Sequence, residues 1–131
     1  MNRLQSVQNA TARLVTGLGR REHIKPALRK LHWLPVRQRV QFKLATLVYR
    51  SLAKTAPNFL SDEHLTSSVG SHSLRSADSR TCVPRRAHTS YGDRCFATVG
   101  PGVWNSLPLQ LRQQDVSFKR FRNVLKTFLF R

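Results

Sequence analysis

Carboxylates are scarce in this sequence. The chain has six Asp and Glu residues against 23 Lys and Arg residues, which gives a formal net charge of +17. Only Asp62 and Glu63 are adjacent. Phosphoryl-transfer centres with two metal ions need clustered carboxylates to hold those ions. We therefore expect no catalytic residues of this kind and no enzyme activity from the chain itself.

Cysteine is scarce too, since Cys82 and Cys95 are the only two. They are too few for a disulfide scaffold, and no Cys-x-x-Cys or His-x-x-x-His spacing suggests zinc. A nucleophile elbow and a phosphate-binding glycine loop are also missing. The sequence therefore predicts two free thiols, no metal, no other cofactor and no small-molecule substrate.

Long apolar runs are absent, and nothing at the N-terminus resembles a signal peptide. A membrane-spanning helix needs about 20 consecutive apolar residues. We therefore expect no transmembrane segment and an intracellular protein. The sequence leaves open whether it resides in the nucleus or in the cytoplasm.

What the chain does have is positive charge, most of it on Arg. Such an excess repels itself in a compact fold, and binding to a polyanion relieves the repulsion. The Arg guanidinium makes bidentate hydrogen bonds to phosphate oxygens and stacks on bases. This composition favours RNA or DNA, bound through phosphate contacts. An anionic membrane surface, bound by an amphipathic helix over residues 118–131, is a weaker alternative.

Apolar spacing predicts a mainly α fold with a minor β-hairpin: a small helical domain that is part of a larger protein. We expect helices over residues 4–18 and 36–52, a short one near Pro26, and a closing helix after an N-cap at Ser117. The organisation predicted is a helical segment over 1–60, a flexible Ser-rich loop over 61–80, and a hairpin plus amphipathic helix over 81–131.

The hairpin prediction pairs two short β-like segments, Thr81–Pro84 and Cys95–Val99. The sequence from Gly100 to Pro108 is interpreted as a turn-rich linker that buries Trp104. Trp33 is likewise expected in the core rather than stacked on a base, because both tryptophans lie in apolar strings bounded by proline.

Nine cations are the candidate nucleic-acid-binding residues, three on each of three predicted elements. They are Arg37, Arg39 and Lys43 on the long helix, Arg85, Arg86 and Arg94 on the hairpin, and Lys119, Arg120 and Arg122 on the last helix. Together they would form a groove that follows a phosphate backbone. Such contacts carry little sequence information, so binding should depend steeply on salt and tolerate any sequence.

Several short strings follow one another in an order that is typical of one family. The set consists of Leu4–Val15, Leu31–Val36, Ala56–Leu60, Trp104–Pro108 and Leu125–Phe130. In this order they resemble the C-terminal, post-thumb region of a non-long-terminal-repeat retrotransposon reverse transcriptase of the jockey-like group. The strings at 31–36 and 104–108 are the most specific, and the resemblance spans nearly the whole chain.

The resemblance implies a function as part of an RNA-directed DNA polymerase. Full-length relatives carry endonuclease and polymerase domains upstream, and they copy element RNA into DNA. This chain lacks the aromatic-x-Asp-Asp turn of a polymerase palm. A non-catalytic grip on template RNA or target DNA is therefore the expected role, with the polymerase domain of the parent protein as a second partner. The alternative is a truncated transposon relic with no molecular activity.

Overall fold

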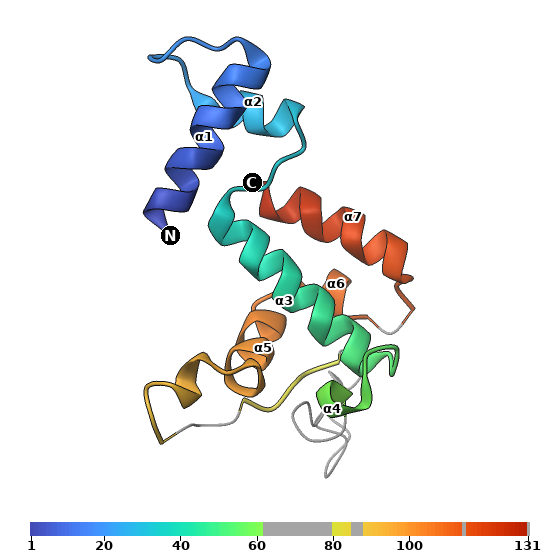
Figure 1. Cartoon of the computed structure of the whole chain (residues 1–131). Coiled ribbons are helices and arrows are strands. Elements are labelled where there is room, and N and C mark those ends of the chain that lie inside the picture. Colours follow the sequence, from blue (N-terminus) through green and yellow to red (C-terminus); the bar gives the residue numbers. More distant parts are fainter. Residues whose placement is uncertain (62–79, 85–87, 114, 131) are drawn as a thin grey trace. The chain divides into compact units, whose positions relative to one another are not determined.

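The computed structural model describes residues 1–61, 80–84, 88–113 and 115–130, and they are mainly helical, as predicted (Figure 1). The elements are α1 (Asn2–Thr16), α2 (Ile24–Lys30), α3 (Val36–Leu52), α4 (Asn58–Ser61), η1 (Gly92–Arg94), α5 (Phe96–Asn105), α6 (Leu109–Arg112) and α7 (Phe118–Leu129). The chain divides into two compact units. The first unit contains residues 1–42 and 126–131, and the second contains residues 43–125.

The first unit is built on α1 and α2. Helix α1 ends at Gly17, whose φ of 68° is the left-handed conformation that glycine adopts without cost. The core of this unit is small: Ala12 of α1, Ala27 and Leu28 of α2, and Leu34 are buried. Alanine at the contact lets two helices approach closely.

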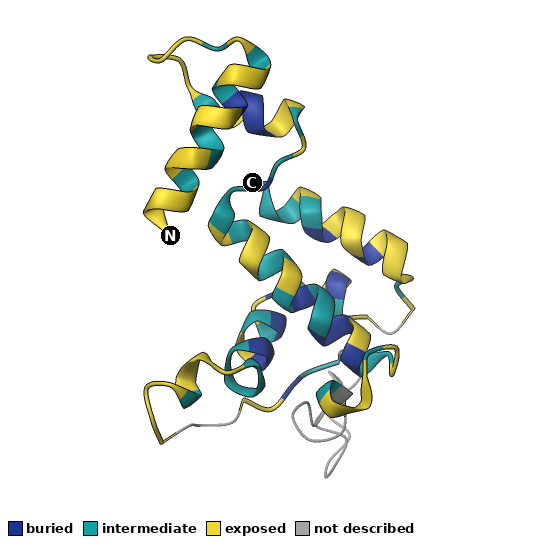
Figure 2. Ribbon diagram, viewed as in Figure 1, coloured by how far each residue is buried: buried dark blue, intermediate teal, exposed yellow. Residues whose placement is uncertain are grey.

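The second unit has an aromatic core. Trp104 of α5 and Phe121 of α7 are almost fully buried, and their rings and that of Tyr49 of α3 form a cluster in which each ring approaches the other two. Buried Tyr and Trp need partners for their polar atoms. The Tyr49 hydroxyl donates to the Val116 carbonyl, and Trp104 Nε1 donates to the Arg80 carbonyl at 2.7 Å. Figure 2 shows buried residues concentrated where these helices meet.

The predicted β-hairpin is wrong. Cys95 is the N-cap of α5, and the residues after it are helical rather than extended. The segment at 81–84 is extended, but its backbone is held at Cys82 by the side chain of Asn105, whose amide donates to the Cys82 carbonyl at 2.7 Å and accepts from the Cys82 N–H at 3.1 Å. Arg80 N–H also donates to the Arg112 carbonyl at 3.1 Å. The segment is therefore held by Asn105 and by the end of α6, not by a strand at 95–99.

The turn-rich linker predicted from Gly100 is also wrong, because α5 continues through Gly100 and Pro101 to Asn105. Both residues are buried. A Cβ atom at Gly100 would lie 3.2 Å from Cγ2 of Val48 on α3, so the glycine permits a close helix approach. Packing against α3 therefore overrides the local turn preference of the sequence.

Other predictions are confirmed in the described residues. Helix α3 begins at Val36 and ends at Leu52, as predicted. Ser117 lies just ahead of α7, and its hydroxyl accepts from the Arg120 N–H at 3.4 Å. Trp104 is buried, whereas Trp33 is half-buried. The loop predicted over 61–80 falls, except at its two ends, outside the described residues.

Candidate nucleic-acid interface

Seven of the nine predicted cations lie in the described part of the chain, and all seven are exposed. They are Arg37, Arg39, Lys43, Arg94, Lys119, Arg120 and Arg122. Arg85 and Arg86 lie outside the described residues. Exposure leaves these charges open to a polyanion, but it does not by itself place them together. Their positions on the helices decide which of them share a surface.

On α3, the cations occupy different faces. Lys43 is exposed and lies seven residues before Arg50, so both project from the same side of the helix. The Arg50 guanidinium also donates to the Thr55 carbonyl at 3.1 Å, which fixes its position at the end of α3. Arg37 lies six residues before Lys43 and projects from a different side. Arg39 is four residues before Lys43, but it belongs to the first unit.

On α7, the three predicted cations also divide between two sides. Lys119 and Arg122 are three residues apart and share one flank of the helix. Arg120 projects from the opposite flank. The guanidinium carbon of Arg122 lies 5.7 Å from the centre of the Phe118 ring, which in turn lies 5.5 Å from the Tyr49 ring of α3. Arg122 is therefore held beside the contact between α7 and α3.

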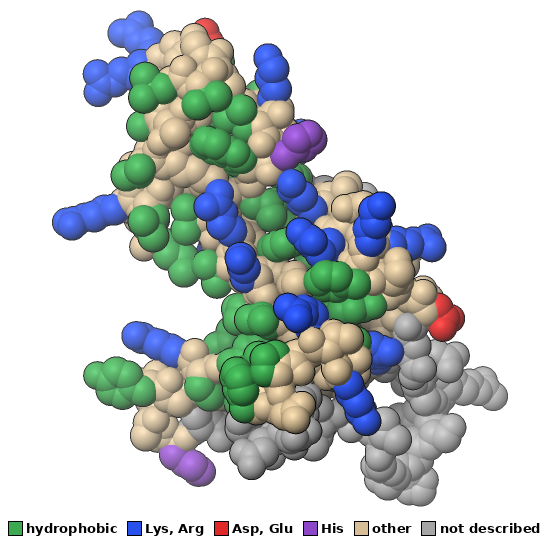
Figure 3. Space-filling view, turned by 45° about the vertical axis from the view of Figure 1, so that its right-hand side comes forward, with side chains coloured by type: hydrophobic (Ala, Val, Ile, Leu, Met, Phe, Trp, Pro, Cys, Tyr) green, Lys and Arg blue, Asp and Glu red, His purple; other side chains and the backbone are tan. Residues whose placement is uncertain are grey.

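The two helices bring their cations to one side of the second unit. Within this unit α3 and α7 run in opposite directions, and the Tyr49–Phe121 stack joins them (Figure 1). Because the two helices are antiparallel, the side of α3 that carries Lys43 and Arg50 faces the same direction as one side of α7. That side of α7 carries Lys119 and Arg122. Figure 3 shows Lys and Arg side chains gathered over α3 and α7. We call Lys43, Arg50, Lys119 and Arg122 the basic patch.

Two other predicted cations of the second unit, Arg94 and Arg120, are not part of the basic patch. Arg94 lies in η1, ahead of α5, and the hairpin that was expected to carry it does not form. Arg120 faces away from the patch on α7. Arg50 was not among the predicted residues, although its spacing of seven from Lys43 on an amphipathic helix was visible in the sequence.

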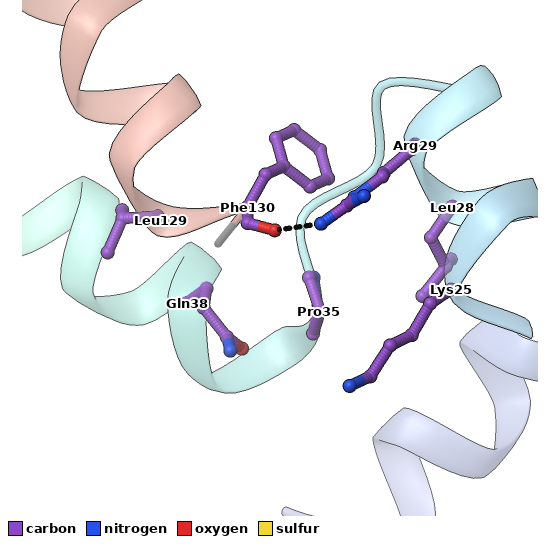
Figure 4. A pocket seen from close by; sticks show the side chains of 7 residues that line it. All are labelled: Lys25, Leu28, Arg29, Pro35, Gln38, Leu129 and Phe130. Atoms are coloured by element: carbon purple, nitrogen blue, oxygen red, sulfur yellow. Dashed lines mark hydrogen bonds between the residues drawn. The ribbon is translucent and has the colours of Figure 1, made fainter.

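A small cavity of about 130 Å³ lies in the first unit (Figure 4). It is lined by Lys25, Leu28, Arg29, Pro35, Gln38, Leu129 and Phe130. Its two cations project from one side of α2, four residues apart. The Arg29 guanidinium donates to the Phe130 carbonyl at 3.0 Å, so it ties α2 to the end of α7. This gives Arg29 a structural role.

Both thiols are free, and their surroundings differ. Burial raises the pKa of Cys82 to about 11, against a smaller lowering effect of Arg112. Cys95 is exposed, and hydrogen bonds with the side chain and backbone of Thr98 lower the pKa of its thiol. Among the described residues, no three His, Cys, Asp or Glu side chains come together in a way that would hold a metal ion.

Helices in the described part of the chain are all too short or too polar to cross a membrane. Comparison with protein-family models, with curated proteins and with solved structures finds no match for this chain.

Proposed function

We propose that this chain is a non-catalytic module that binds RNA or DNA through phosphate contacts without reading sequence. We further propose that it derives from the C-terminal region of a retrotransposon RNA-directed DNA polymerase, on the strength of the ordered motifs from Leu4 to Phe130. The observation that carries the binding proposal is the basic patch, in which two helices joined by a buried aromatic core present four cations to one side.

The spacing within the basic patch suits a nucleic-acid strand. Lys43 and Arg50 lie seven residues apart, which is about 10 Å along a helix axis. That distance corresponds to about three nucleotides at the ~3.4 Å rise of one strand of duplex DNA. Lys119 and Arg122 add a second pair of cations on the neighbouring helix. Two rows of cations on a rigid base can follow a phosphate backbone.

Trp104 is not available to stack on a base. Trp104 is 1% exposed, and its indole N–H is already bonded to the Arg80 carbonyl, so it offers no face for a base to stack on. Backbone contacts position a protein on nucleic acid but carry no sequence information. The proposed binding therefore discriminates little between sequences.

The alternative of a membrane-surface helix is weakened by the burial of α7. Phe121 and Leu125 are both 0% exposed and form part of the core of the second unit. An interfacial helix inserts its apolar face among lipids. In α7 that face is already packed against protein, so lipid binding would require the second unit to open.

A salt titration tests the proposal. Fluorescence anisotropy with a labelled single-stranded RNA and a duplex DNA of unrelated sequence should show affinity falling linearly on a log–log plot as salt rises. Four phosphate contacts give a slope of about −2.8 for a single strand, at roughly 0.7 per contact. Scrambled sequences should bind equally well. Micromolar or weaker binding with no salt dependence contradicts the proposal.

A further inference from the structure

Helix α1 turns its polar side toward its own unit and its apolar side outward. Gln8 Nε2 donates to the Leu34 carbonyl at 2.9 Å, and Gln5 Oε1 accepts from the Val36 N–H at 2.8 Å. Ala12, on the same side, is fully buried. In a surface helix of a globular protein the apolar stripe normally faces the core. The reversed orientation of α1 leaves its apolar stripe without a partner in the first unit.

The outward stripe extends along most of the helix, with Thr11 as a polar residue within it. Leu4 and Val7 are each 64% exposed, Leu14 is 84% exposed and Val15 is 60% exposed. Single exposed apolar residues are ordinary, but a contiguous apolar row on one helix marks an interaction surface. Figure 2 shows exposed residues along much of α1.

The spacing of the stripe fits packing against another helix. Leu4, Val7, Thr11 and Leu14 follow one another at intervals of three, four and three residues. This alternation is the a/d repeat of a coiled-coil seam, which packs against another helix with the same repeat. The polar residue within this seam, Thr11, donates its hydroxyl to the Val7 carbonyl of the same helix at 3.0 Å, so the seam carries no unpaired polar group there.

We infer that the outward stripe of α1 pairs with α1 of a second copy of this chain. A two-fold interface uses one patch twice, and an a/d seam is complementary to itself. The charge on α1 is low enough to allow this. The helix carries only Arg3 and Arg13, and the Arg13 guanidinium is turned back to bond the carbonyls of Gly19 and Glu22.

The low charge also argues against lipid as the occupant. Membrane-surface helices line their polar side with Lys and Arg that meet anionic headgroups. The polar side of α1 instead carries Gln5, Gln8 and Asn9, which face the first unit. The residues of α1 therefore fit the pairing of two identical uncharged seams better than insertion into lipid.

The size of the seam sets the strength of the pairing. Fifteen residues make a helix about 22 Å long, so one helix pair buries an area at the low end for protein interfaces, roughly 1,000 Å² in total. The net charge of +17 on each copy opposes association. The dimer is therefore weak and forms most readily where salt screens the repulsion. Its salt dependence is the reverse of that for nucleic-acid binding.

Sedimentation velocity on the full chain, without nucleic acid, tests the inference. We expect monomers at low ionic strength and a concentration-dependent dimer near 1 M salt, where the Debye length falls to about 3 Å. The variant V7Q/L14Q should stay monomeric at both salt concentrations. The control L109Q, at a residue that is 60% exposed in the second unit, should dimerise like the parent.

The two proposals fail in different ways. A chain that is monomeric at every salt and protein concentration overturns the pairing, whether α1 is covered by a different protein or by another part of the same chain. Association that V7Q/L14Q leaves intact, or that L109Q abolishes, also overturns it. Because both substituted residues in V7Q/L14Q are well exposed, circular dichroism should show parental helix content. None of these outcomes bears on nucleic-acid binding, which is measured separately at low salt.

Discussion

The ring of Tyr49 on α3 stacks on the ring of Phe121 on α7, with 4.6 Å between their centres and 26° between their planes. The same tyrosine approaches Trp104 of α5 at 6.5 Å, so one side chain joins three helices of the second unit. Since the basic patch is divided between α3 and α7, this contact fixes the spacing of its cations.

Replacing Phe121 with alanine should destabilise the second unit severely. The ring is 0% exposed and touches two other aromatic rings, so its loss leaves a cavity that costs about 3–5 kcal/mol. Urea unfolding followed by circular dichroism measures the change. Val124 on the same helix is 39% exposed, and V124A should cost far less. Equal losses for the two variants would show that the aromatic cluster is not the core.

Two glycines in α5 should respond in opposite directions to alanine. A Cβ at Gly100 meets Cγ2 of Val48 at 3.2 Å, so G100A crowds the α3–α5 contact and should cost about 1–3 kcal/mol. Gly102 has no atom within 4 Å of a Cβ, and G102A should stabilise the helix by about 0.5–1 kcal/mol. Thermal melting of both variants gives the comparison. A stabilising G100A contradicts the close approach.

Asn105 should control access to Cys82. Its amide group holds the backbone of Cys82 through two hydrogen bonds, and Cys82 is 1% exposed. In N105A the extended segment loses both bonds, and the thiol should react faster with a disulfide reagent under native conditions. Cys95 is exposed and serves as the internal control, with an unchanged rate. If the rate at Cys82 does not change, the Asn105 bonds do not hold the segment.

Stability should fall at high pH because of Cys82. Burial raises its pKa from 9.0 to about 11, so the folded chain holds this proton more tightly than the unfolded chain does. The contribution of the protonated Cys82 thiol to the free energy of unfolding is fully present below the unfolded pKa of 9.0, and it is lost as pH rises toward 11. Urea unfolding across this range should show the decline, and C82A should show less of it. An identical decline in C82A would assign the effect to other groups.

The sequence predicted those elements whose local signals agree with their packing. In α3 the apolar spacing from Val36 agrees with its role in the core, and Ser117 is a favoured cap at the start of α7. In α5 the local signals disagree with the packing. Gly100 and Pro101 are typical of turns, yet both are buried in a helix, where Gly100 lies close to Val48 of α3. Such a tertiary effect has no local signature.

The candidate site was predictable in composition but not in arrangement. Charge alone indicated phosphate binding, and Lys43, Lys119 and Arg122 were among the predicted residues. Grouping Lys119 and Arg122 with the cations of α3 required knowing that Phe121 packs on Tyr49, which sets how α7 lies against α3. The outward stripe of α1 could not be anticipated either, because its spacing is the same as that of a helix that faces a core.

The most direct test of the central claim compares two charge-matched variants in the salt titration with single-stranded RNA. K43Q/K119Q removes two cations of the basic patch, and R94Q/R120Q removes two exposed cations that lie away from it. We expect K43Q/K119Q to reduce the salt slope by about 1.4, at roughly 0.7 per lost phosphate contact, and R94Q/R120Q to leave the slope near that of the parent. Equal reductions in both variants would contradict the patch, because binding would then depend on net charge alone.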